Sequence, residues 1–180
     1  MGRIVNNTYI TLDGDITNMQ DWHFDYMGAL MDEARTQLWA AGALIMGRAT
    51  YDGFAGSWPQ RDGDFADRIN GLKKYAVSTT LTDPEWSNTT VLSDNVVEQV
   101  RKIKEETEGN IVQYGFGSVT RLLLDAGLVD EVRLWLHPVL SGKAKPADLL
   151  YRDAVQTKFT LNSAEPHDNG VVILSYTPIG

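Results

Sequence analysis

Residues 111–120 read Ile-Val-Gln-Tyr-Gly-Phe-Gly-Ser-Val-Thr, and this stretch decides the fold. It begins as a short apolar run typical of a buried strand, and apolar residues recur at helical spacing from Val119 to Ala126. The two intervening glycines allow close approach of the backbone to a ligand, and a helix start attracts phosphate through its free N–H groups. The alternative is a plain tight turn with close helix packing. The residues that would hold a phosphate here are Gly115, Phe116, Gly117, Ser118 and Val119.

The same apolar spacing predicts elements on both sides of this stretch. Gly42 is expected to end the first long helix, and Gly127 to end the last one in a Schellman motif. Asn95 and Glu98 have the spacing of a capping box, and Asp168-Asn169-Gly170 is a β-hairpin signal. Strands are expected at residues 3–11, 43–46, 74–78, 89–92, 111–114, 131–137, 159–161 and 171–175, and helices at residues 21–41, 48–54, 65–72, 96–103 and 119–126.

The order of these elements predicts the fold class. Strands and helices alternate up to about residue 128, and strands dominate after it. This order predicts an α/β fold with a mostly parallel central sheet, flanking helices and an antiparallel C-terminal hairpin at one edge. A chain of 180 residues suffices for one compact domain, which is expected to span residues 1–180.

Composition excludes several classes of protein. With 16 Lys+Arg against 24 Asp+Glu the formal net charge is −8, which disfavours binding to nucleic acid or to an anionic membrane. The absence of cysteine removes disulfide scaffolds, cysteine nucleophiles and iron–sulfur clusters. No signal core and no run approaching the ~20 apolar residues of a membrane span is present, so a cytoplasmic protein is expected. The three histidines, His23, His137 and His167, have no ligand spacing, and no metal site is expected.

Two further turns directly follow predicted strands, and like residues 115–119 they are called corners. Gly47-Arg48-Ala49-Thr50 adds a guanidinium, which binds phosphate bidentately, and Ser78-Thr79-Thr80 adds hydroxyl donors. Each alone also fits a plain role, as a surface arginine beside a turn or as an ordinary strand end. Because open α/β sheets bind ligands at the carboxyl ends of their strands, the three corners together predict a dinucleotide site. Its members outside the first corner are Gly47, Arg48, Thr50, Ser78, Thr79 and Thr80.

Asp13 and Asp25 are the candidate catalytic residues. Asp13 ends the first strand and would orient or protonate a substrate if burial raised its pKa; the alternative is a turn residue. Asp25 opens the first long helix, where aspartate also serves as a cap or dipole partner. The candidate substrate-pocket residues are Trp22, Tyr51 and Trp58, which would stack on a flat heterocycle or else belong to the core.

Six short motifs, in this order, resemble the dihydrofolate reductase-like superfamily. The similarity is closest to bacterial proteins like the C-terminal reductase domain of bifunctional riboflavin-biosynthesis deaminase/reductases, and it covers nearly the whole chain. The motifs are Leu12-Asp13-Gly14, Asp21-Trp22, residues 46–51 (Met-Gly-Arg-Ala-Thr-Tyr), residues 74–81 (Lys-Tyr-Ala-Val-Ser-Thr-Thr-Leu), residues 114–118 (Tyr-Gly-Phe-Gly-Ser) and residues 127–134 (Gly-Leu-Val-Asp-Glu-Val-Arg-Leu) followed by His137-Pro138.

This resemblance implies an eight-stranded mixed sheet, NADPH as cofactor, hydride transfer to a small pteridine-like or pyrimidine-like heterocycle, and a homodimer. It also implies that Gly47, Arg48 and Thr50 hold the adenosine side and the phosphates of NADPH. Ser78 and Thr79 would lie by the ribose and its 2′-phosphate, and residues 115–119 by the pyrophosphate. The chain departs from the riboflavin-type reductases at Asn7 and Thr11, where those enzymes have lysine and serine, and this argues against a phosphoribosyl substrate.

Three functions therefore remain open from the sequence. The first is an NADPH-dependent reductase of a small heterocycle. The second is a non-catalytic NADP(H)- or nucleotide-binding protein of the same fold. The third is a dimeric interaction module with a vestigial pocket.

Overall fold

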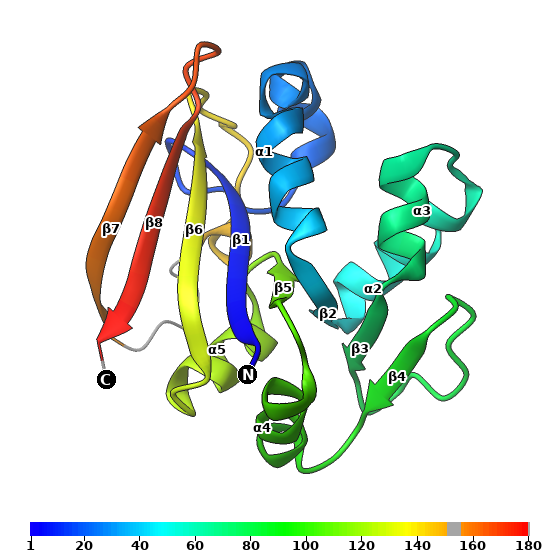
Figure 1. Cartoon of the computed structure of the whole chain (residues 1–180). Coiled ribbons are helices and arrows are strands. Elements are labelled where there is room, and N and C mark those ends of the chain that lie inside the picture. Colours follow the sequence, from blue (N-terminus) through cyan, green and yellow to red (C-terminus); the bar gives the residue numbers. More distant parts are fainter. Residues whose placement is uncertain (151–155, 180) are drawn as a thin grey trace.

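The computed structural model describes residues 1–150 and 156–179. Its centre is an eight-stranded sheet in the order β4-β3-β2-β5-β1-β6-β8-β7 (Figure 1). The first six strands in this order are parallel, whereas β8 pairs antiparallel with β6 and β7 antiparallel with β8. The predicted fold class is confirmed. The strands are β1 (Arg3–Thr11), β2 (Ala41–Gly47), β3 (Lys73–Val77), β4 (Thr89–Leu92), β5 (Asn110–Tyr114), β6 (Val129–His137), β7 (Lys158–Pro166) and β8 (Val172–Ile179).

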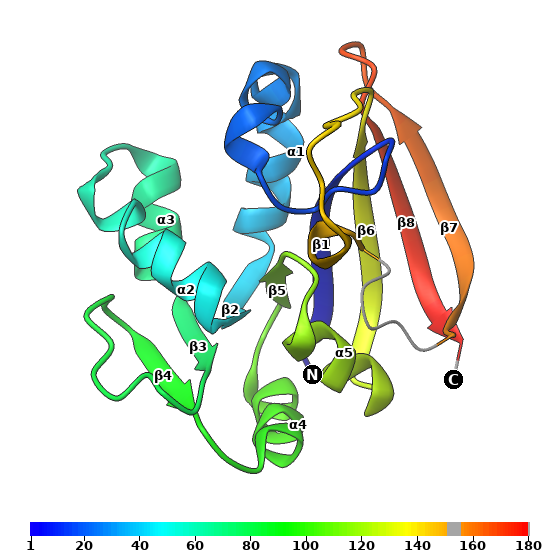
Figure 2. The same cartoon turned by 180° about the vertical axis from the view of Figure 1, so that it is seen from behind.

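Helices cover both faces of the sheet, as Figures 1 and 2 show from opposite sides. Leu44 and Met46 of β2 pack with α1, α2 and α3, while Ala43 and Ile45 pack with α4 and α5. Strand β2 is therefore buried on both faces, which explains its uninterrupted apolar sequence. The helices are α1 (Met27–Trp39), α2 (Arg48–Ala55), α3 (Asp64–Gly71), α4 (Val96–Glu106) and α5 (Ser118–Asp125), with short 3₁₀ turns η1 (Met19–Asp21), η2 (Phe24–Tyr26), η3 (Trp58–Gln60) and η4 (Pro146–Asp148).

Polar residues of β1 lie in the middle of the sheet. Asn6 and Thr8 are 0% and 1% exposed, because β1 is paired with β5 on one side and β6 on the other. Asn6 Nδ2 donates to Gln113 Oε1 at 3.1 Å and to the Gly115 carbonyl at 2.7 Å, and Thr8 Oγ1 donates to Asn6 Oδ1 at 2.8 Å. These buried polar groups therefore hold the end of β5 against β1.

The predicted ends of two helices, α1 and α4, need correction. The helix expected over residues 21–41 is α1, which begins at Met27, after the two 3₁₀ turns. Gly42 does not end it: this residue lies inside β2, where a Cβ atom would meet the Glu108 carbonyl oxygen at 1.9 Å. Glycine is required there by the close approach of two backbones, and not by a left-handed helix end. Asn95 does precede α4, but its side chain makes no capping hydrogen bond, so the capping box is not formed.

Other local predictions are confirmed. Gly127 has φ +64°, and the N–H groups of Gly127 and Leu128 donate to the Leu124 and Leu123 carbonyls at 2.9 and 2.8 Å, as a Schellman motif requires. The hairpin between β7 and β8 turns at residues 168–170.

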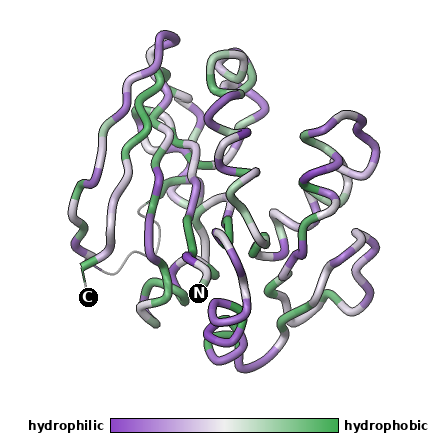
Figure 3. The backbone as a smooth tube through the Cα atoms, viewed as in Figure 1, coloured by the Kyte–Doolittle hydropathy of each residue, from purple (hydrophilic) through white to green (hydrophobic). Residues whose placement is uncertain are grey.

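Figure 3 shows hydrophilic residues on the outer turns of α4 and apolar stretches along the central strands. Within residues 1–150 and 156–179, no helix has the length and apolar character needed to cross a bilayer.

Candidate functional site

The three predicted ligand-binding corners lie side by side at one edge of the sheet. Strands β3, β2 and β5 are neighbours and parallel, so their carboxyl ends meet at the same edge. The corners after them are residues 78–80, 47–50 and 115–119, and together these three corners form the carboxyl edge of the sheet. The prediction that they converge in space is confirmed by contacts between them.

The corners after β2 and β5 touch through their glycines. A Cβ atom on Gly47 would lie 3.2 Å from Val119 Cγ2, a tight contact that the Val119 side chain would have to relieve by a small shift. Gly115 has φ +79°, a left-handed conformation that favours glycine, and a Cβ atom there would lie 3.8 Å from Thr50 Oγ1. Both glycines thus keep the backbone free of side chains where the two corners meet.

The corner after β3 joins the other two through Arg48. Arg48 Nη1 donates to Thr80 Oγ1 at 3.2 Å, and Arg48 Nε lies 2.8 Å from Asp52 Oδ1 in an exposed ion pair one helical turn away. Ser78 is 8% exposed, and its hydroxyl accepts the N–H groups of Thr80 and Leu81 at 3.2 and 3.1 Å. Ser78 therefore shapes the turn, while Thr79 and Thr80 present exposed hydroxyls.

Helix α5 begins directly at the carboxyl edge. Gly117 precedes it with extended backbone, φ −148° and ψ −158°. Thr120, which stands where a Rossmann fingerprint has its third glycine, is 1% exposed, and its hydroxyl accepts the Gly117 N–H at 3.3 Å. The first turn of a helix leaves N–H groups without intrahelical acceptors, so the start of α5 at Ser118 is a favourable place for an anion.

The two candidate acids are both solvent-exposed. Asp13 accepts hydrogen bonds from the Thr11 hydroxyl and from the N–H groups of Ser141 and Gly142, the last two at 3.0 Å. These bonds, above all that from Thr11, lower the pKa of Asp13 well below its usual range, because they stabilise the carboxylate. The raised pKa on which a proton-donor role depended is therefore not found. Asp25 lies in the first turn of η2, and its side chain forms no hydrogen bond or ion pair with another described residue.

The three candidate aromatic residues do not form one wall. Tyr51 is buried in the core between α2, α3 and the sheet, where its hydroxyl accepts the Trp86 N–H at 3.2 Å, and the partly buried Trp58 packs against this core and stacks on Phe65. Trp22 instead packs against His137, with ring centroids 4.9 Å apart. Aromatic spacing along a sequence does not separate core residues from residues that line a ligand site, and here Trp22 and Tyr51 are buried at 5% and 4% exposure.

A buried histidine pair at the end of β1 and β6 escaped the sequence analysis. His23 and His137 are 4% and 0% exposed, and His23 Nδ1 lies 3.0 Å from His137 Nε2. His137 is paired with Thr11, the last residue of β1, and Tyr9 stacks on His23 with ring centroids 4.1 Å apart. The two residues are separated by 114 positions in the sequence. The one signal was that His137 ends a predicted strand in which apolar and polar residues alternate.

Hydrogen bonding fixes the protons of this pair. His137 Nδ1 lies 2.7 Å from the Trp135 carbonyl and must donate to it, so His137 Nε2 is the acceptor and His23 Nδ1 the donor. Burial lowers the pKa of His23 to about 4, with a further contribution from His137, and burial also lowers the pKa of His137. Both rings are therefore neutral at pH 7. No group of three or more metal-ligating side chains occurs in the described part of the chain.

The mostly parallel sheet with helices on both faces, together with glycine and hydroxyl corners at its carboxyl edge, defines an α/β domain with a candidate ligand site at the carboxyl ends of its strands. The model of the RibD C-terminal domain family matches residues 3–173, and the chain belongs to that family.

Several individual proteins are similar to this chain. The uncharacterized protein YyaP of Bacillus subtilis (strain 168) is 26% identical over 97% of this chain and 94% of its own length. The structure of a protein from Shewanella sp. PV-4, assigned to riboflavin biosynthesis, superposes with a TM-score of 0.75 at 17% identity and covers 99% of both chains. The deaminase/5-amino-6-(5-phosphoribosylamino)uracil reductase of Thermotoga maritima superposes with a TM-score of 0.67 at 18% identity, and 57% of that longer chain is covered. These structures show a shared fold.

Proposed function

We propose that the chain is an NADPH-dependent reductase of a small pteridine-like or pyrimidine-like heterocycle. The observation that carries the proposal is the convergence of the three corners, joined by the contact of Gly47 with Val119 and by the hydrogen bond from Arg48 to Thr80. Membership of the RibD C-terminal domain family and the fold shared with a uracil reductase support a reductase of the riboflavin-biosynthesis type.

The residues of the carboxyl edge fit a dinucleotide phosphate. The pyrophosphate would lie at the start of α5, where Gly115 and Gly117 keep Cβ atoms away and the helix start supplies N–H donors. The 2′-phosphate would be held by Arg48, whose guanidinium is exposed and can release Thr80, with the hydroxyls of Thr79 and Thr80 beside it. NADPH supplies the hydride when it is bound, and the protein supplies orientation and exclusion of water.

The acceptor is a small heterocycle without a phosphoribosyl group. Asn7 stands at the lysine position of riboflavin-type reductases, and its Oδ1 accepts the Trp135 Nε1–H at 3.3 Å instead of offering a cation. Asp13 is exposed and ionised, so its role is to hold residues 141–142 in place beside the end of β1.

A second function has one specific observation in its favour. The chain is a non-catalytic NADP(H)-binding protein of the same fold if no acid near the carboxyl edge delivers a proton, and the lowered pKa of Asp13 supports this alternative. The two functions share the cofactor site and differ only in turnover.

One experiment addresses both functions. NADPH is titrated into the protein with tryptophan and cofactor fluorescence as the readout, and the oxidation of bound NADPH is then followed with a panel of oxidised pteridines and amino-substituted pyrimidinones. Binding with oxidation supports the reductase, and binding without oxidation by any compound supports the second function. Absence of binding at millimolar NADPH overturns both.

A further inference from the structure

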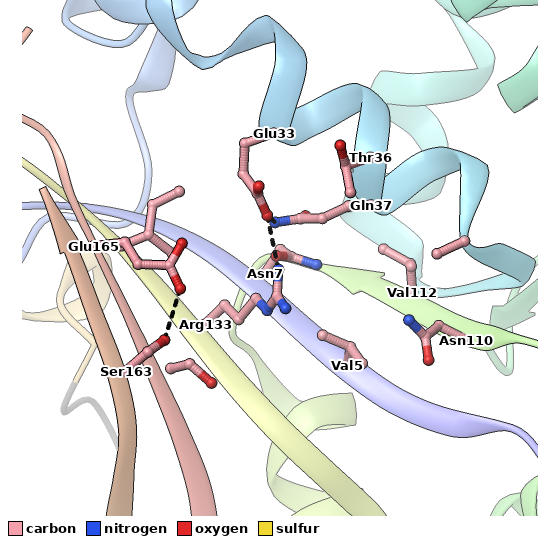
Figure 4. Close-up of a pocket in the computed structure, with 13 residues that line it drawn as sticks. Val5, Asn7, Glu33, Thr36, Gln37, Asn110, Val112, Arg133, Ser163 and Glu165 are labelled. Carbon is pink, nitrogen blue, oxygen red and sulfur yellow. Dashed lines mark hydrogen bonds and ion pairs between the residues drawn. The ribbon is translucent and has the colours of Figure 1, made fainter. Parts of the chain in front are cut away.

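A cavity lies on the α1 face of the sheet. Its volume is about 240 Å³, and it is enclosed by the second half of α1, the first halves of β1 and β5, β6 and the β7–β8 hairpin (Figure 4). Asn7 and Val112, which line it, precede the ends of their strands at Thr11 and Tyr114, so the cavity does not belong to the carboxyl edge. Pockets for drug-sized ligands occupy roughly 300–1,000 Å³, so this one suits a smaller molecule.

Asn7 presents an unused hydrogen-bond donor to this cavity. The residue is 2% exposed, and its Oδ1 accepts the Trp135 Nε1–H at 3.3 Å. Because an indole nitrogen only donates, this contact fixes the orientation of the amide and leaves Nδ2 as the free end. Nδ2 has no hydrogen-bond partner among the described residues, and buried polar groups without partners are rare. Figure 4 shows Asn7 at the centre of the lining side chains.

The walls around Asn7 are rich in acceptors. Glu33 accepts from Arg133 Nη1 at 2.9 Å and from Gln37 Nε2 at 3.2 Å, as the dashed lines in Figure 4 indicate. Glu165, on the opposite wall, accepts from Ser163 Oγ at 2.9 Å and has further lone pairs.

The charges of the cavity disfavour an anion. Arg133 also binds the buried Glu131 through Nε at 2.6 Å, so its charge is shared by two carboxylates, while Glu165 lines the cavity and pairs with no cation in residues 1–150 and 156–179. Anionic ligands are therefore repelled. A matching ligand accepts one hydrogen bond from Asn7 Nδ2 and donates N–H groups to carboxylate oxygens.

We propose that this cavity binds a small uncharged molecule that carries a carboxamide or an equivalent carbonyl next to an N–H group. The carbonyl oxygen accepts from Asn7 Nδ2, the N–H donates to the carboxylate of Glu165, and the apolar part of the molecule lies against Val5 and Val112. The proposal stands on these contacts alone and is independent of the dinucleotide site.

Benzamide and benzoate test this proposal, because they have the same shape and differ in carboxamide against carboxylate. With uniformly ¹⁵N-labelled protein, benzamide is expected to shift the Asn7 side-chain amide signals and to saturate them, while benzoate binds at least tenfold more weakly. Equal binding of the two probes overturns the proposal. So does the absence of any shift at Asn7 up to the solubility limit of benzamide.

Two variants localise the binding. Asn7→Asp keeps the acceptor for Trp135 but removes the donor, and benzamide affinity is expected to fall at least tenfold, with Asn88→Asp on an exposed turn as the unchanged control. Thermal melting checks that the first variant folds; if it does not, Glu165→Gln at an exposed position gives the deciding measurement, with an expected loss of severalfold. Unchanged affinity in the folded variant overturns the proposal. Arg48→Ala, which addresses the dinucleotide site, is expected to leave benzamide binding intact.

Discussion

Arg48 Nη1 donates to Thr80 Oγ1 at 3.2 Å, and this bond joins the corners that follow β2 and β3. The two residues are 32 positions apart and come together because β2 and β3 are parallel neighbours with their carboxyl ends in register. Arg48 is thereby held beside the hydroxyl of Thr80, where a phosphate that displaced Thr80 would meet donors from both corners.

Replacement of Arg48 by alanine is expected to weaken NADPH binding by about ten- to a hundredfold, since a hydrogen bond to a charged group contributes about 1.5–3 kcal/mol. NADH, which lacks the 2′-phosphate, is expected to lose much less affinity. Fluorescence titration with both cofactors measures the difference. Arg35→Ala is a matched control, because both arginine side chains are 44% exposed and paired with an aspartate. Equal losses for NADPH and NADH would remove Arg48 from the 2′-phosphate site.

Substitution of Gly117 by valine is expected to abolish dinucleotide binding and to leave the fold intact. The backbone of Gly117 is extended, so it accepts a side chain without strain, but that side chain would stand beside the start of α5. Titration with NADPH and a thermal melt test the two halves of this prediction. Gly71→Val, at the end of α3 with nothing within 4 Å of an added Cβ, serves as the control. Retained binding in a folded Gly117→Val protein would place the phosphates elsewhere.

The buried histidine pair predicts a loss of stability in mild acid. Burial lowers the pKa of His23 in the folded protein to about 4, below the value of 6.5 in the unfolded chain. The unfolded state therefore binds more protons between these values, and the free energy of unfolding falls as the pH drops from about 6.5 to about 4, by at most about 1.4 kcal/mol per pH unit for one proton.

Urea unfolding at several pH values measures this dependence. His23→Asn keeps a donor toward His137 but cannot titrate, so its stability is expected to change less between pH 6.5 and pH 4 than that of the natural chain. An unchanged slope in this variant would assign the acid sensitivity to other groups. Asp13 contributes to the acid sensitivity only at lower pH. Folding lowers its pKa from the usual 3.8, so the stabilisation from its hydrogen bonds is lost as the pH falls below that value.

Asn6 is expected to support both the fold and the carboxyl edge. Asn6→Leu has a similar shape but leaves the Gly115 carbonyl and Gln113 without their donor, and this should reduce the free energy of unfolding by about 1–3 kcal/mol. NADPH affinity should fall as well, because Gly115 then keeps only its backbone hydrogen bond to Asn7 of β1. Asn162→Leu, on the exposed strand β7, should change stability by less than about 0.5 kcal/mol. A stability loss no larger than that of Asn162→Leu would contradict this role.

Much of the fold follows from local pattern. The apolar run at residues 43–46 predicted a strand, and Gly127 predicted the Schellman end of α5, because both depend on neighbours in the sequence. Gly42 was interpreted as a helix end, although its real constraint is the Glu108 carbonyl of a distant segment. Long-range backbone contacts of this kind leave no local signal.

The site was predictable to a similar degree. The three corners could be grouped because parallel strands bring their carboxyl ends to one edge. The His23–His137 pair and the free donor of Asn7 could not be found, since each depends on tertiary packing between residues far apart in the chain. The predicted aromatic wall failed because burial in the core and stacking on a ligand favour the same residue types.

The central claim is that three corners from distant parts of the chain hold one dinucleotide. Amide chemical-shift mapping of the ¹⁵N-labelled protein during an NADPH titration tests it most directly. The expected result is a single saturating transition that shifts the signals of residues 47–50, 78–80 and 115–119 together. Shifts confined to one of these corners, or located on another face of the protein, would contradict the claim.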